Sequence, residues 1–218
     1  MRIAMPTGAV AVSMLMAMLA ATGGARADSY TDFTRALGND DTKTVAQLIA
    51  RGVDPNTVNE NAEPALLYAA REGTPAMVRT LIRGKANVNV RTPQGDTPIM
   101  LAALAGSLAT VKVLREAGAQ INHPGWTPLQ YAAFNGHDAV VEYLVSTGAD
   151  LGLAAPNGAT PVMLAVLSNK ADTVKLLVSY GFDVDAKNDK GETALDIARS
   201  KGFREIEKLL RAPPAARR

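Results

Sequence analysis

The stretch from Gly125 to Val145 places its apolar residues at the spacing of two short helices. Thr127 followed by Pro128 predicts a helix start, because a Thr hydroxyl caps free backbone N–H groups and Pro at the first helical position lacks an N–H that would be unpaired. Small apolar side chains follow, and Gly136 can end this helix in a left-handed conformation. A second apolar helix is predicted over residues 140–145. Such a helix–turn–helix unit is too short to bury its own apolar faces.

The same pattern recurs along the chain at a nearly constant interval. The predicted first helices start at Pro64, Thr97, Thr127, Thr160 and Thr193. The steps between these starts are 33, 30, 33 and 33 residues. A second apolar helix follows each start, and residues 32–49 form a reduced helix pair ahead of the first full unit. The low aromatic content of 5% also favours packed helices over a β-sandwich. The sequence therefore predicts a stacked array in which each unit buries its faces against its neighbours.

The interval and the repeated Thr-Pro-Leu-x-x-Ala pattern resemble the ankyrin repeat over roughly residues 30–211. The resemblance implies an all-α fold, an ankyrin-repeat solenoid of about six helix-turn-helix units with short β-hairpin-like fingers. The polar residues near both ends fit capping repeats. The predicted units are an N-terminal capping repeat over 28–60, ankyrin repeats over 61–92, 93–122, 123–155 and 156–188, and a C-terminal capping repeat over 189–211. The tail over 212–218 is expected to be disordered.

Three departures from the ankyrin pattern are expected to matter. The His of the family motif is replaced in every unit, by Leu67, Met100, Gln130, Met163 and Asp196. Each replacement is expected to remove a local hydrogen bond worth about 1 kcal/mol. Lys85 occupies a turn position where the family usually has Gly, so a left-handed backbone there would be strained, unless the neighbouring Gly84 shifts the turn. A three-residue deletion between Asn122 and Thr127 shortens the finger ahead of the best-matching unit.

The first 27 residues have the pattern of a secretory signal peptide. Arg2 precedes an apolar run over residues 9–21 that only Ser13 interrupts, and Ala25 and Ala27 form a small-x-small cleavage site. The run is too short to cross a bilayer comfortably as a helix. Cleavage after Ala27 is therefore expected. A membrane anchor and an Ala-rich disordered leader are the alternatives.

Charge and cysteine content exclude several classes of function. The chain has 23 basic and 21 acidic residues. Removal of residues 1–27, which hold Arg2 and Arg26, leaves 21 of each. A chain with no basic field is not expected to bind nucleic acid. The absence of Cys excludes disulfides, thiolate chemistry and a lipoprotein anchor.

The sequence offers no candidate catalytic group, cofactor site or metal site. Two His and no Cys argue against a conventional zinc site, and no Gly-rich phosphate loop follows a strand. Asp40 and Asp41 are interpreted as helix caps, and Asp183 and Asp185 as part of a turn. A calcium site of carboxylates alone is the alternative, although the spacing lacks the regular oxygen pattern of a known loop. We therefore expect a protein that is not an enzyme and needs no cofactor.

The ankyrin resemblance implies a concave surface made of finger tips and the exposed side of the first helices. Seven residues after each helix start lie Arg71, Leu104, Phe134, Leu167 and Ser200. The middle three predict an apolar stripe, and Trp126 lies on the finger just before Phe134. The full set of predicted partner-binding residues is Trp126, Phe134, Leu104, Leu167, Arg71, Asn135, Gln94, Asp96, Asn157 and Lys190. The alternative is that the stripe and Trp126 pack against neighbouring repeats. Glu60, Glu63 and Asp96 predict a negative edge that suits a partner with a basic rim.

These observations favour a non-catalytic scaffold for protein–protein interaction in the bacterial periplasm. It resembles small exported ankyrin proteins of Gram-negative bacteria, and would serve as accessory, inhibitor or immunity factor to an exported enzyme. The expected partner is another protein, with no nucleic acid, no membrane after signal cleavage, and a chain that is monomeric by itself. The alternative is a secreted ankyrin effector that binds a host protein.

Overall fold

The computed structural model describes residues 28–59 and 61–211. The predicted signal peptide and C-terminal tail lie outside these residues. The described chain folds into six helix pairs, of which the first consists of a helical segment over residues 28–38 and α2. The helices are α2 (Thr42–Ala50), α3 (Ala65–Glu72), α4 (Pro75–Arg83), α5 (Pro98–Leu104), α6 (Leu108–Glu116), α7 (Pro128–Asn135), α8 (Asp138–Ser146), α9 (Pro161–Leu167), α10 (Ala171–Ser179), α11 (Ala194–Lys201) and α12 (Arg204–Arg211).

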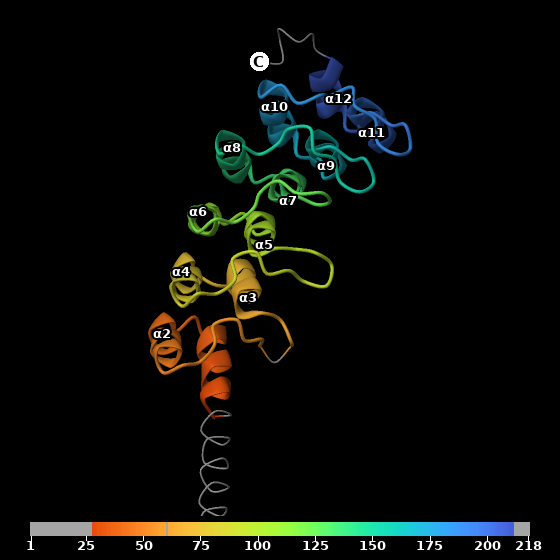
Figure 1. The fold of residues 1–218 in the computed structure, drawn as a ribbon. Helices are drawn as coiled ribbons and strands as arrows, with labels where there is room; N and C mark the ends of the chain where they lie inside the picture. Colours follow the sequence, from red (N-terminus) through yellow and green to blue (C-terminus); the bar gives the residue numbers. More distant parts are fainter. Residues whose placement is uncertain (1–27, 60, 212–218) are drawn as a thin grey trace, which may run out of the picture.

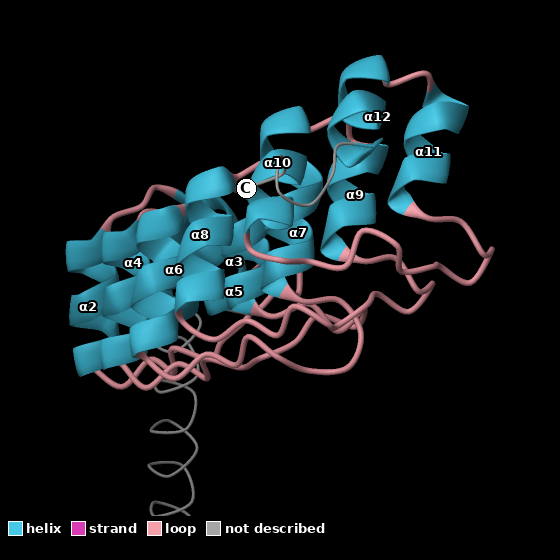
Figure 2. Ribbon diagram, turned by 90° about the horizontal axis from the view of Figure 1, so that it is seen from above, coloured by secondary structure: helices cyan, strands magenta, loops and turns pink. Residues whose placement is uncertain are grey.

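The pairs stack into two parallel rows of helices, as Figure 1 shows. One row runs from segment 28–38 through α3, α5, α7, α9 and α11, and each of the named helices contacts the next. The other row contains α2, α4, α6, α8, α10 and α12, again with neighbours in contact. Figure 2 shows the loops gathered along one edge of the array. The predicted all-α solenoid is confirmed.

Small side chains let the first-row helices approach closely. Ala102, Ala132 and Ala165 are fully buried at equivalent positions of α5, α7 and α9. The second-row helices turn branched apolar residues into the same core, and Val141 and Leu144 of α8 are also fully buried. The core is therefore one continuous layer between the two rows, as expected when each unit depends on its neighbours.

Most fingers are tight turns rather than strands. In residues 59–63, 92–96, 155–159 and 188–192 the first N–H donates to the last carbonyl, and the fourth N–H donates back to the first carbonyl. The described residues contain no strand, only a single bridge between Val58 and Pro64. Residues 122–126, which carry the predicted deletion, form no such turn. The central finger is thus built differently from the others.

The helix starts correct one expectation about the missing His. The backbone N–H at the Thr of the motif still has an acceptor in three units: the Met100 sulfur at 3.3 Å, Gln130 Oε1 at 2.9 Å and Asp196 Oδ2 at 3.0 Å. The expected loss of a hydrogen bond in every unit was therefore wrong, because a long side chain can fold back onto the same N–H. The fully buried Gln130 also donates to the Leu153 carbonyl, which ties α7 to the next finger.

Asparagine side chains link the loops of successive units. Asn56 Oδ1 accepts from the Asn87 backbone N–H at 2.7 Å, and Asn89 Oδ1 accepts from that of Gln120 at 3.0 Å. Asn122 Oδ1 continues the series by accepting from the Asp150 N–H at 2.9 Å. The three Asn residues are 33 positions apart, so the same bond is repeated at each junction.

Asp41 and the pair of Asp183 and Asp185 have the predicted structural roles, whereas Asp40, also predicted as a helix cap, instead links two units. Asp41 caps α2 by accepting from the Thr44 backbone N–H at 3.0 Å and from its hydroxyl at 2.6 Å. These bonds lower the pKa of Asp41. Asp40 accepts from the N–H and hydroxyl of Thr74 in the next unit. Asp183 accepts from the Asp185 N–H within a turn.

The backbone at Lys85 is left-handed, with φ of 76°, so the neighbouring Gly84 does not take over this conformation. The matching turns of other units use Gly52, Gly118 and Gly148, with φ between 90° and 99°. Lys85→Gly should raise the free energy of unfolding by about 1 kcal/mol, because only glycine adopts this conformation without a Cβ clash. Urea denaturation at neutral pH measures the change. Lys85→Ala is the control: it removes the long side chain but keeps the Cβ, and an equal gain from it would contradict strain as the cause.

Candidate protein-binding surface

The predicted apolar stripe is partly exposed. Phe134 near the end of α7 is 41% exposed, and Leu167 at the end of α9 is 40% exposed. Leu104, at the end of α5, is half-buried. Since α5, α7 and α9 are successive neighbours, these equivalent positions follow one another along the first row. The polar positions at either end of the series, Arg71 and Ser200, are exposed. An apolar strip with polar ends suits protein contact.

Trp126 is half-buried and packs against the apolar core. Its ring lies against Tyr131 of α7, with centroids 5.4 Å apart and planes tilted by 32°. The Tyr131 hydroxyl in turn donates to Asp96 Oδ1 of the preceding finger at 2.6 Å. Trp126 is therefore a packing residue, as the alternative held, and part of its side chain stays accessible.

Tyr131 is a site residue that the sequence reasoning missed. It lies four residues after its helix start, where Leu101 and Leu164 of the flanking units are buried. The sequence signal that could have identified Tyr131 is a tyrosine at a position where the flanking units have leucine. Burial and the bond to Asp96 raise the pKa of Tyr131 above its ordinary value. Asp96, predicted as a partner-binding residue, accepts the hydrogen bond of this hydroxyl through Oδ1.

Asn135 joins two repeats instead of facing a partner freely. Its Nδ2 donates to the Leu104 carbonyl at 2.7 Å, and His137 Nε2 lies 3.0 Å from the same oxygen. The two side chains together satisfy the carbonyl at the C-terminal end of α5, which has no intrahelical partner. The imidazole of His137 also fills the space that a Cβ at Gly106 would occupy.

Arg71 is engaged by two carboxylates of its own unit. Its guanidinium donates to both oxygens of Glu63, at 2.8 and 3.0 Å, and to Glu72 at 2.9 Å. Hydrogen bonds to Glu72 and Glu63 raise the pKa of Arg71, although burial opposes them. The predicted negative edge is thus partly neutralised, since Glu63 is paired with Arg71. Glu60 lies outside the described residues.

The remaining predicted contact residues lie on finger tips. Gln94, Asn157 and Lys190 are exposed. Asn157 Oδ1 accepts from the Ala159 N–H at 3.2 Å, which helps to close its turn. Among the described residues, no hydrogen bond or ion pair links Gln94, Asn157 or Lys190 to the apolar stripe.

Candidate metal ligands are scattered in the described part of the chain, which holds no group of three or more His, Cys, Asp or Glu residues suited to a metal ion. His123 Nδ1 lies 2.8 Å from the Pro124 carbonyl oxygen, while its buried Nε2 has no hydrogen-bond partner among the described residues. Over those same residues, no helix combines the length and apolarity needed to span a bilayer.

Tyr131→Phe should weaken the fold at neutral pH by about 1 kcal/mol, because it removes a hydrogen bond to a carboxylate. The raised pKa also gives a pH dependence. Tyr131 is neutral in the folded state when the unfolded state begins to ionise near pH 10, so its contribution is complete below pH 10 and is lost as pH rises further. Urea denaturation between pH 8 and 11 should show a smaller decline for the variant. Tyr180→Phe, which alters an exposed tyrosine, is the control and should match the wild type.

Comparison with known proteins identifies the repeat. A family model described as ankyrin repeats (3 copies) matches residues 33–124 and 145–216, and the model for a single ankyrin repeat matches residues 124–155. Together these cover most of the chain.

Several animal proteins are similar to this chain over part of its length. Ankyrin repeat and SAM domain-containing protein 6 of Mus musculus is 37% identical over 120 residues, which are 53% of this chain and 14% of that protein. SH3 and multiple ankyrin repeat domains protein 1 of Homo sapiens is 34% identical over 120 residues, 52% of this chain and 6% of its own length. Protein phosphatase 1 regulatory subunit 27 of Mus musculus is 36% identical over 95 residues, 42% of this chain and 62% of its own. The chain therefore spans less than two thirds of each relative, and the likeness concerns the repeats. The chain belongs to the ankyrin-repeat family, whose arrays are scaffolds for protein–protein interaction.

Proposed function

We propose that this chain binds another protein through the strip formed by Leu104, Phe134 and Leu167, with Trp126 beside it. The observation that carries the proposal is the exposure of Phe134 and Leu167, at 41% and 40%, on neighbouring helices. Large apolar side chains that stay exposed side by side are typical of interaction sites. The partner would present a complementary apolar face to these helices.

The array beneath the strip supports a preformed binding surface. Gln130 and Asn135 both make hydrogen bonds to neighbouring units. Trp126 is held by Tyr131, and Tyr131 by Asp96. A surface held in place in this way loses little conformational entropy on binding, which favours affinity. The binding role needs no chemistry from the protein, which agrees with the proposal of a scaffold that is not an enzyme.

The proposed compartment is the bacterial periplasm, where the scaffold would act as accessory, inhibitor or immunity factor to an exported enzyme. The support is the signal-like pattern over residues 1–27 together with the absence of Cys. The alternative, supported by the same pattern, is a secreted effector that binds a host protein.

Phe134→Ser combined with Leu167→Ser should reduce capture of a partner from periplasmic extract at least tenfold, because both changes remove apolar contact area. The melting temperature should change little, since exposed side chains contribute little to stability. Tyr180→Ser is the matched control: Tyr180 is also 40% exposed but follows α10 in the other row. Equal capture by the double variant would contradict this site, and a large loss of melting temperature would show that the strip is core. Trp126 is left unchanged here because its removal would also disturb Tyr131.

Expression of the full chain in a Gram-negative bacterium should yield a mature protein that begins at Asp28, since export signals are cut after a small-x-small pattern. N-terminal sequencing of the periplasmic fraction measures this. Ala27→Arg should block the cut and is the control. An uncut chain in the membrane fraction would favour an anchor, and recovery in the culture supernatant alone would favour the effector.

A further inference from the structure

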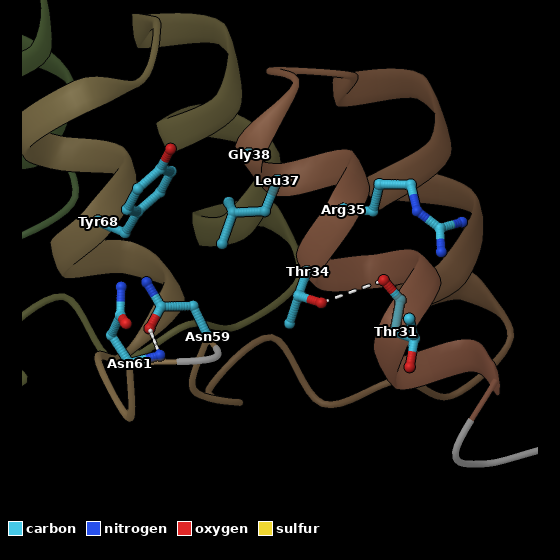
Figure 3. Close-up of a pocket in the computed structure, with 8 residues that line it drawn as sticks. All are labelled: Thr31, Thr34, Arg35, Leu37, Gly38, Asn59, Asn61 and Tyr68. Carbon is cyan, nitrogen blue, oxygen red and sulfur yellow. Dashed lines mark hydrogen bonds between the residues drawn. The ribbon is translucent and has the colours of Figure 1, made fainter.

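A hollow of about 260 Å³ lies between the first two units, at the opposite end of the first row from α11. Segment 28–38 provides one wall with Leu37, Thr34 and Arg35, and α3 with its finger provides the other with Tyr68, Asn59 and Asn61. Figure 3 shows Tyr68 standing opposite Leu37, with Asn59 and Asn61 below it. The hollow is smaller than the 300–1,000 Å³ of pockets for drug-sized ligands. Its size therefore suits one side chain or the end of a peptide.

Tyr68 occupies the same place in its unit as Tyr131 in the central one. Each tyrosine lies four residues after its helix start, at Pro64 and at Thr127. The surroundings of Tyr131 show what complements a tyrosine at this position of the array: an indole ring against its face and a carboxylate on its hydroxyl.

Tyr68 has neither complement among the described residues. Its hydroxyl has no hydrogen-bond partner there, and no aromatic ring lies against it. Glu63 takes the place that Trp126 has before Tyr131, and its carboxylate is turned to Arg71 instead. The hollow therefore lies beside a tyrosine that, unlike Tyr131, lacks both a ring against its face and a carboxylate on its hydroxyl.

The hollow has groups that can donate to an anion. The Tyr68 hydroxyl and the Asn61 amide can both donate, and Arg35 is the one charged residue among the described residues that line the hollow. Figure 3 shows the guanidinium of Arg35 extending away from Tyr68, and one of its nitrogens lies 3.1 Å from Asp32. Both partners of this ion pair are more than half exposed, and such surface pairs contribute little. The guanidinium can therefore leave Asp32 and bind an incoming carboxylate, which makes Arg35 a candidate partner for an anion.

We propose that this hollow binds an aromatic side chain with an adjacent carboxylate, supplied by a partner protein. The ring would take the place that the indole has against Tyr131, and the carboxylate would accept from the Tyr68 hydroxyl as Asp96 accepts from Tyr131. The carboxylate belongs either to a C-terminal aromatic residue or to an acidic residue beside the ring. The site rests on the proposed protein-binding function for the origin of its ligand, but its chemistry is separate from the strip at Phe134.

The test uses two pairs of small probes on residues 28–218, followed by ¹H–¹⁵N NMR. N-acetyl-phenylalanine represents a C-terminal aromatic residue, and its control is N-acetyl-phenylalaninamide, which lacks the carboxylate. N-acetyl-Asp-Phe-amide represents an acid beside a ring, and its control is N-acetyl-Asn-Phe-amide. We expect one acidic probe to bind at least fivefold more tightly than its neutral control and to shift the amide signals of Leu37, Gly38, Asn61 and Tyr68. The stronger acidic probe identifies the source of the carboxylate.

Tyr68→Phe keeps the ring and should weaken the acidic probe about tenfold, because it removes a hydrogen bond to a charged group. Arg35→Gln should weaken the same probe and leave its neutral control unchanged. Tyr180→Phe, a hydroxyl removed far from the hollow, should have no effect.

Equal binding of the acidic and neutral probes, shifts confined to other units, no binding at millimolar probe, or full affinity in Tyr68→Phe would each overturn the proposal. The Phe134→Ser and Leu167→Ser double variant should bind the probes normally. The proposal for the strip and the proposal for the hollow can therefore be contradicted independently of each other.

Discussion

No helix pair of this chain can bury its own apolar surface, so every unit depends on the fit between first-row helices of successive units. That fit requires small side chains where the helices approach, and Ala102, Ala132 and Ala165 meet the requirement. A larger residue at any of these positions would separate two units and expose the branched residues of the second row as well. Stability is consequently shared along the array, and the end units need polar outer faces because they have only one neighbour.

Polar bonds between units then fix the register that apolar stacking leaves free. The Asn series at residues 56, 89 and 122 joins loop to loop, and Asp40 joins the first unit to Thr74. Near the centre, Gln130, Asn135 and His137 all reach backbone carbonyls of adjacent units. These bonds use side chains that could otherwise have faced a partner. Phe134 and Leu167 on the first row make no such bond, and their side chains stay exposed.

The periodic part of the sequence predicted the fold because it reports the local geometry of each unit. The helix starts at Thr127 and Thr160 and the left-handed Gly136 are all set by neighbours in the chain. Contacts between units could not be predicted in this way. The bond from Tyr131 to Asp96 spans 35 residues, and Asn135 looked like a surface residue until its amide was placed on the Leu104 carbonyl. The hydrogen bonds at the replaced family His could not be predicted either. Met100 and Gln130 differ from His in length and chemistry but accept from the same backbone N–H.

The shortened central finger accounts for much of what distinguishes this array. Residues 122–126 lack the turn that closes the other fingers, and Trp126 follows directly on the deletion. The indole rests on Tyr131, whose hydroxyl reaches back to the preceding finger. In the shortened finger, the contact between Trp126 and Tyr131 therefore replaces the missing turn. This contact holds the finger against α7. Where the finger keeps its full length, before α3, the turn at residues 59–63 closes by its own backbone bonds and needs no ring. Tyr68 on α3 is consequently free of the contact that covers Tyr131, although the two residues occupy the same position in the repeat.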